Sequence, residues 1–97
     1  EYYSNLNKKN MKESFKDCDQ LLVVEGRIPS TIDIANCAFS NSGIRDVNFL
    51  KEQHYINSAD GMFEGCKQLN NVFNDIYVNQ ADNIFKGCSN LQFVNNY

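Results

Sequence analysis

Several classes of protein are excluded by what this sequence lacks. Its apolar stretches are far shorter than the roughly 18–20 residues that a transmembrane helix needs, so we expect no direct insertion into a membrane. Nine Lys and Arg stand against twelve Asp and Glu, and the formal charge of -3 provides no basic surface for nucleic acid. The 97 residues have room for one small domain, and a large enclosed active site is not expected.

Groups that carry catalysis or bind metal ions are equally scarce. His54 is the single imidazole and lies in a polar stretch, residues 51–55, which favours a solvated loop histidine over a catalytic base. The four cysteines include no Cys-x-x-Cys pair, which argues against zinc, and the glycines match no phosphate-binding pattern. Asp60 and Asp82 stand at equivalent places, so a repeated capping or solvated role explains them more simply than acid–base catalysis. We therefore predict no catalytic residue, no metal site, no cofactor and no enzyme activity.

A repeat dominates what is present. Four phenylalanines set its frame, Phe15, Phe39, Phe63 and Phe85, with separations of 24, 24 and 22 residues. These separations fall within the window of about 20–29 residues that is typical of leucine-rich repeats. Two further columns keep this frame, and they hold Met11, Ala35, Ala59 and Ala81; and Cys18, Ser42, Cys66 and Cys88. A third column, Val24, Val47, Val72 and Val94, keeps it once a single deletion in the second unit is allowed for. Such columns indicate stacked units that bury equivalent side chains together.

Each unit is predicted to contain a helical turn, a tight corner and a short strand. The apolar spacing i, i+3, i+4 over residues 59–63 and 81–85 favours one helical turn. Short parallel strands are expected over Leu21–Glu25, Ile44–Asn48, Leu69–Phe73 and Leu91–Asn95. The sequence thus predicts an α/β fold, a leucine-rich-repeat solenoid that forms a single domain over residues 1–97, with repeats at about 8–31, 32–55, 56–77 and 78–97.

Two stretches carry a family resemblance. Residues 38–47 and 62–72, together with the Phe-x-x-Cys-x-x-Leu-x-x-Val corner at 15–24, 63–72 and 85–94, resemble BspA-like leucine-rich repeats. The resemblance implies a repeat domain of cell-surface proteins that bind host or matrix proteins or other cells. It is specific for a fold and says little about a particular molecular function.

The cysteines have two interpretations. In the column of Cys18, Cys66 and Cys88, a free thiol would fill a tight corner as a small buried apolar group. Alternatively, Cys66 and Cys88 form a disulfide, because neighbouring units bring equivalent atoms to roughly 5 Å. Ser42 in the same column favours the packing role. Cys37 lies outside the column and is expected to be a packing residue or a half-exposed thiol.

The predicted strands suggest a binding face. Because strand side chains alternate, residues next to the core valine would face outward. We predict binding residues at Val23, Asp46, Asn71, Phe73 and Phe93, where large apolar groups lie among polar ones. A purely structural alternative is that Phe73 and Phe93 cover each other or pack under terminal residues such as Tyr97.

The favoured function is a non-catalytic recognition or adhesion module, extracellular or displayed on a cell surface, that binds a protein partner through this face. The alternative is a structural scaffold, which could be cytoplasmic, whose units assemble through the ends of the stack. End-to-end self-association would follow, because the end of a repeat stack presents unpaired strand edges.

Overall fold

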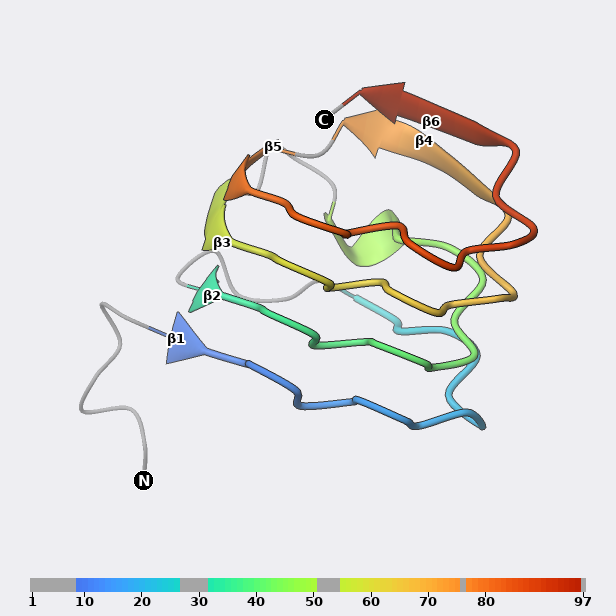
Figure 1. Ribbon diagram of the computed structural model, residues 1–97, viewed down its shortest axis with the longest axis horizontal. Helices are drawn as coiled ribbons and strands as arrows, with labels where there is room; N and C mark the ends of the chain where they lie inside the picture. Colours follow the sequence, from blue (N-terminus) through green and yellow to red (C-terminus); the bar gives the residue numbers. More distant parts are fainter. Residues whose placement is uncertain (1–8, 27–31, 51–54, 76, 97) are drawn as a thin grey trace.

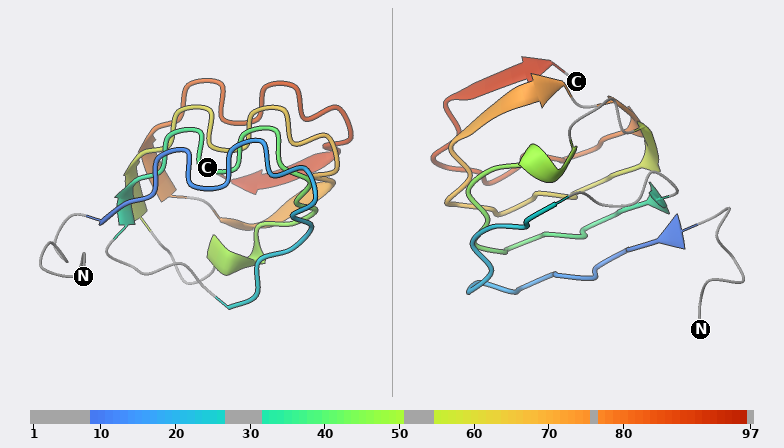
Figure 2. Two further views of the ribbon diagram at one scale, coloured as in Figure 1. Left: turned by 90° about the horizontal axis from the view of Figure 1, so that it is seen from below. Right: turned by 180° about the vertical axis from the view of Figure 1, so that it is seen from behind.

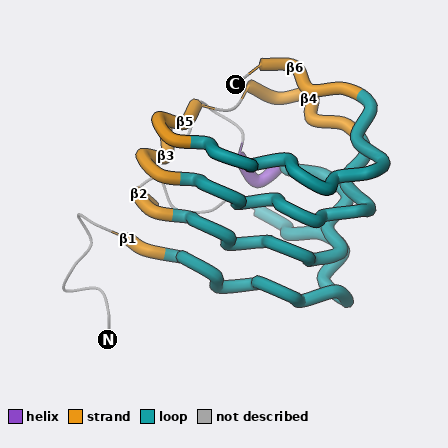
Figure 3. The backbone as a smooth tube through the Cα atoms, viewed as in Figure 1, coloured by secondary structure: helices purple, strands orange, loops and turns teal. Residues whose placement is uncertain are grey.

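The computed structural model describes residues 9–26, 32–50, 55–75 and 77–96, and these four stretches lie one above another (Figure 1). We call them the first, second, third and fourth rungs. In order along the chain, the described elements are β1 (Lys9–Asn10), β2 (Ile32–Ile34), a 3-10 helix η2 (Asn48–Leu50), β3 (Tyr55–Ser58), β4 (Asn71–Asp75), β5 (Tyr77–Gln80) and β6 (Phe93–Asn96). A strand opens each rung, and a second strand ends the third and the fourth rung. Long irregular stretches connect the strands (Figure 3).

Two parallel sheets hold the rungs in register. The first sheet has the order β1-β2-β3-β5, so each of its strands opens a rung and pairs with the opening strand of the next one. Ile56 of β3, for example, is paired with Val78 of β5. The second sheet consists of β4 and β6 and pairs Val72 with Val94. Both pairings connect residues 22 positions apart, which is the spacing of Phe63 and Phe85 in the sequence.

The predicted fold class is wrong. The described residues contain no α-helix, and their one helical segment is the three-residue η2, so the chain is not a solenoid of helix–strand repeats. Residues 59–63 and 81–85, which the apolar spacing assigned to helical turns, form non-helical turns in the second half of the stack. Viewed from below, the turns of successive rungs follow the same wavy path and nest in one another (Figure 2, left).

Backbone conformation explains why these turns are not helical. Each rung has two left-handed residues four positions apart, at Glu13 and Asp17, Cys37 and Asn41, Gly61 and Gly65, and Asn83 and Gly87. Glycine and asparagine adopt the left-handed region more readily than other residues, whereas an α-helix requires a run of right-handed residues. Alternate N–H groups therefore point out of the rung. Gly61 N–H donates to the carbonyl of Asp82 at 2.8 Å, and Phe63 N–H donates to that of Ile84 at 3.1 Å.

The strand predictions were wrong in the first two rungs. Residues 21–25 and 44–47 contain no strand, and Asn48 already belongs to η2. In the last two rungs β4 and β6 overlap the predicted segments, but each begins two residues later and ends beyond the predicted end. The four-stranded sheet was missed. Its strands contain the column of Ile32, Ile56 and Val78, a weaker signal because each strand has only two to four residues.

The core lies between the sheets and the turns. Phe39 and Phe63 are fully buried and belong to a stack of rings that runs from Phe15 through Phe39 and Phe63 to Phe85, with ring centroids 5.3, 5.8 and 5.9 Å apart. Phe49 of η2 packs against this stack, with its ring centroid 5.0 Å from that of Phe39. The η2 segment lies on the side opposite the turns (Figure 2, left). The predicted core columns are confirmed in the middle rungs, where Ala35, Ala59, Ile44, Leu69, Val47 and Val72 are buried.

Candidate functional site

The predicted binding residues lie along the side of the stack where the rungs leave their second turn. Arg45 N–H donates to the carbonyl of Leu22 at 3.1 Å, and Asn70 N–H donates to that of Arg45 at 3.4 Å. Gln92 N–H continues the series to the carbonyl of Asn70 at 2.8 Å. The residues that follow these four are Val23, Asp46, Asn71 and Phe93, and Asn71 is paired with Phe93 between β4 and β6. The backbone therefore brings four of the five predicted residues into one column.

Phe73 lies in β4, beyond the position of Asn71 in the column. Phe73 follows Asn71 by two residues, in the part of β4 where the register with β6 shifts between Val72 and Asp75. The side chains of Asn71, Phe73 and Phe93 lie outside the described part of the structure. Whether Phe73 and Phe93 face outward or cover each other therefore stays a prediction.

Val23 and Asp46 have described side chains with different environments. Val23 is 49% exposed, although it is a large apolar residue. Asp46 is partly buried, and its carboxylate accepts a hydrogen bond from Asn48 N–H at 3.1 Å. This short-range bond caps the first residue of η2, so Asp46 has a local structural role that the sequence did not indicate.

Leu22 is a surface residue that sequence reasoning missed. It is 42% exposed beside Val23, and together they form an apolar patch on the first rung, next to the exposed Arg45 of the second. The signal was the run Leu21-Leu22-Val23-Val24, because consecutive residues of an extended chain cannot all face one core. Leu21 and Val24 are the two that pack against the core. Tyr55, at 56% exposed, lies at the start of β3 in the other sheet.

The cysteine column is a set of free thiols. Cys66 is buried and donates from Sγ to the carbonyl of Phe39 at 3.0 Å, while Cys88 makes the same bond to Phe63 at 3.1 Å. Ser42 Oγ lies 3.6 Å from Cys66 Sγ, so the serine continues the column. Burial raises the pKa of Cys66, and burial together with the neighbouring Cys66 raises the pKa of Cys88 to about 11.

In this environment the Cys66 and Cys88 thiols pack against neighbouring rungs and are poor nucleophiles. A thiol with a raised pKa remains protonated at neutral pH, whereas reactive cysteines have a lowered pKa. Cys18 differs from the predicted pattern because it is exposed on the first rung, which has no rung beneath it among the described residues.

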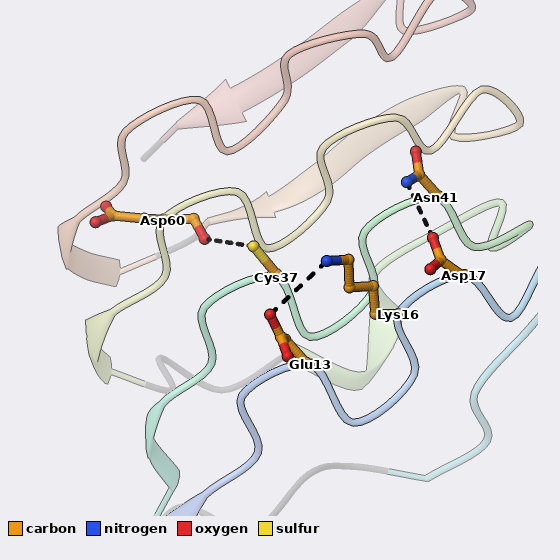
Figure 4. Close-up of polar contacts among 6 residues, drawn as sticks. All are labelled: Glu13, Lys16, Asp17, Cys37, Asn41 and Asp60. Atoms are coloured by element: carbon orange, nitrogen blue, oxygen red, sulfur yellow. Dashed lines mark hydrogen bonds and ion pairs between the residues drawn. The ribbon is translucent and has the colours of Figure 1, made fainter.

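Cys37 occupies one of the left-handed turn positions, with φ of 55°. Its thiol is partly buried and lies 3.8 Å from the carbonyl of Asp60 in the next rung (Figure 4). The same close-up shows Asn41 donating from Nδ2 to Asp17 Oδ1 at 3.0 Å, and Lys16 Nζ 3.8 Å from a Glu13 carboxylate oxygen. These contacts connect residues of one turn or of neighbouring rungs.

Asp60 belongs to a ladder of side chain to backbone bonds. The side-chain carbonyl of Asn36 accepts from Asp60 N–H at 2.9 Å, and the Asp60 carboxylate accepts from Asp82 N–H at 2.9 Å. Each acidic or amide side chain thus caps the backbone of the rung above it. The same ladder ends at Asp82, which belongs to the fourth rung, the last of the described rungs.

An open depression of about 290 Å³ lies at the second turn. It is lined by Asp19, Asn41, Ser42, Gly43, Gly65, Lys67 and Gln68. Two rungs approach closely beside it, since a Cβ on Gly43 would lie 2.5 Å from the carbonyl oxygen of Asp19. The depression therefore follows from rung packing.

Within the described rungs, no group of three or more His, Cys, Asp and Glu side chains is placed to hold a metal ion. His54 lies outside the described residues. No helix in the described ranges has the length and apolar character to cross a bilayer. No family model matches the chain, and comparisons with curated proteins and with solved structures give no match.

Proposed function

We propose that this chain is a non-catalytic recognition module that binds a protein partner through the side formed by β4, β6 and the segments aligned with them. The observation that carries the proposal is the exposed pair Leu22 and Val23, 42% and 49% accessible on a small stack with a well-filled core. Apolar side chains beside a charged group are typical of protein-binding surfaces, since arginine and apolar residues contribute much of the energy of such contacts. Arg45 supplies that charged group on the neighbouring rung.

The chemistry of the remaining groups supports binding over catalysis. The Cys66 and Cys88 thiols donate to backbone carbonyls and have raised pKa values, so they favour a packing role. The Asp60 carboxylate accepts a backbone N–H from the next rung. These are structural uses of residue types that an enzyme would need in a pocket.

Surface display is part of the proposal and rests on the resemblance to BspA-like repeats. Treating intact producing cells with a protease tests it. Loss of the protein from unbroken cells supports display. Survival until the cells are lysed would assign the chain to an internal compartment.

The binding surface is tested by a double variant, Leu22→Ser with Val23→Ser, and by Tyr55→Ser as a matched control. Both sites are exposed, so each variant should fold with an unchanged circular dichroism spectrum. Cross-linking to proteins of the cells or matrix that the producing cell meets should identify partners. These partners should be lost with the double variant and kept with Tyr55→Ser; equal capture by both variants would refute the assignment of this side.

A further inference from the structure

The two ends of the stack carry opposite halves of one hydrogen-bonding pattern. Between the first and second rungs, Glu13 N–H donates to the carbonyl of Asn36 at 3.0 Å and Asp17 N–H donates to that of Ser40 at 2.7 Å. The later rungs repeat these bonds at Cys37 to Asp60, Asn41 to Glu64, Gly61 to Asp82 and Gly65 to Lys86. In each of these six bonds the earlier rung donates and the later rung accepts, whereas the later rung donates on the side of Arg45 and Gln92.

The pattern is incomplete at each end. In the fourth rung the equivalent donors are the N–H groups of Asn83 and Gly87, and neither bonds another residue within the described rungs. In the first rung the equivalent acceptors are the carbonyls of Lys12 and Lys16, which likewise receive no bond from the described residues. Along these turns, the fourth rung therefore presents donors and the first rung presents acceptors, in the same spacing.

We propose that a second copy of this chain docks head to tail, with its first rung on the fourth rung of the copy below. In the register of the existing junctions, Asn83 and Gly87 N–H donate to the carbonyls of Lys12 and Lys16 of the second copy. Ala81 N–H, which is equivalent to Ala35 and Ala59, donates to the carbonyl of Asn10 of that copy. The contact involves the turns of the first rung, whereas the side proposed to bind another protein begins farther along the same rung, at Leu22 and Val23.

Backbone shape favours a copy of this chain as the occupant. The fourth rung has left-handed residues at Asn83 and Gly87, with φ of 59° and 78°, and the first rung has them at Glu13 and Asp17, with φ of 58° and 64°. Two rungs with the same path can pair along their whole turns, as neighbouring rungs do within the stack. A partner without this pattern of left-handed residues would match the donors of only a short segment.

Charge also favours this arrangement at the ladder of Asn36, Asp60 and Asp82. Asp82 stands above Asp60, and its carboxylate would meet Lys12 of the second copy, which occupies the equivalent position in the first rung. Lys86 would face Lys16, an opposing effect that the Glu13 carboxylate, 3.8 Å from Lys16, reduces. Because the two surfaces differ, the contact is heterologous and does not close on itself, so copies add in a row.

Sedimentation velocity of the chain over a wide range of concentration tests the proposal. Mass should rise in steps of one chain. Ala81→Pro removes one donor and places a ring at the edge, and should weaken association about tenfold or more, whereas Ala81→Ser keeps the N–H and should not. A folded chain that stays monomeric throughout would overturn the proposal.

Charge reversal provides a second test that leaves the backbone intact. Asp82→Lys and Lys12→Glu, each alone, should weaken self-association by up to about fivefold, the size of an exposed ion pair. An equal mixture of the two variants should recover it, because the donor end of each then meets an acceptor end of opposite charge. Association that neither variant changes, or that mixing does not recover, would locate the contact elsewhere and contradict the head-to-tail arrangement.

Discussion

Replacing Gly43 by alanine probes the close approach of the first two rungs. The φ of Gly43 is not left-handed, so the substitution introduces no backbone strain of its own. The added Cβ would lie 2.5 Å from the carbonyl oxygen of Asp19 and 3.1 Å from that of Leu21. Both atoms belong to the backbone of the neighbouring rung and cannot rotate away. The rungs must separate, which stretches the bond from Gly43 N–H to the Cys18 carbonyl, already 3.4 Å long.

The expected cost of Gly43→Ala is about 2–3 kcal/mol, from the overpacking and the weakened hydrogen bond. Gly26→Ala is the matched control. Gly26 has φ of 84° and open space around it, so alanine there costs only left-handed strain, about 1 kcal/mol. Urea unfolding followed by circular dichroism should show a lower midpoint for Gly43→Ala at an unchanged slope. A cost at Gly43 equal to or below that at Gly26 would refute the described packing of these rungs.

Three further predictions concern the turns, the ring stack and the thiols. Cys37→Gly should raise the free energy of unfolding by about 0.5–1 kcal/mol in urea titrations, because φ of 55° strains a cysteine; a loss of stability would contradict this. Phe63→Ala, fully buried, should cost about 3–5 kcal/mol, and Phe15→Ala, 40% exposed, clearly less; equal costs would argue against the ring stack. Since the pKa of Cys88 is raised in the fold, its contribution to stability is present below the ordinary value of 9.0 and is lost as pH rises toward 11. Between pH 8 and 11 the melting temperature should fall less for Cys88→Ala than for the unsubstituted protein. An equal fall in the two would show that Cys88 is not the cause.

The repeat frame could be predicted because buried positions of successive rungs are occupied by the same types of apolar residue. Phe39 and Phe63 lie in the middle of the core, and the spacing that joins them in sequence is the spacing at which their rungs stack. Val47 and Val72 are buried for the same reason. At the end of the stack the same column behaves differently, since Phe15 has no described rung below it and remains 40% exposed.

The local structure could not be predicted from apolar spacing alone. Ala59, Met62 and Phe63 have the i, i+3, i+4 pattern of a helical turn, but the left-handed Gly61 and Gly65 divide the segment into turns. The two glycines in the sequence were a signal against a helix there. Cys37 gave a weaker signal, because cysteine rarely adopts a left-handed conformation and the bond from its N–H to the carbonyl of Asp60 exists only once the rungs have stacked.

The binding side could be placed only in part. The column of Val23 and Asp46 follows from the repeat, since equivalent positions stack. The bond from Asn48 N–H to the Asp46 carboxylate depends on η2, which no pattern in the sequence indicated. Leu22 was missed because a run of four apolar residues was assigned to a strand, and the chain there has no strand.

Hydrogen exchange of the backbone amides, measured by NMR at increasing protein concentration, tests the account most directly. Amides that donate between rungs, such as those of Cys37 and Gly61, should be protected at every concentration. Those of Asn83 and Gly87 should exchange fast in dilute solution and become protected as copies add to the end of the stack. Fast exchange at Cys37 and Gly61 would contradict the stacked rungs, and fast exchange at Asn83 and Gly87 at high concentration would contradict their head-to-tail assembly.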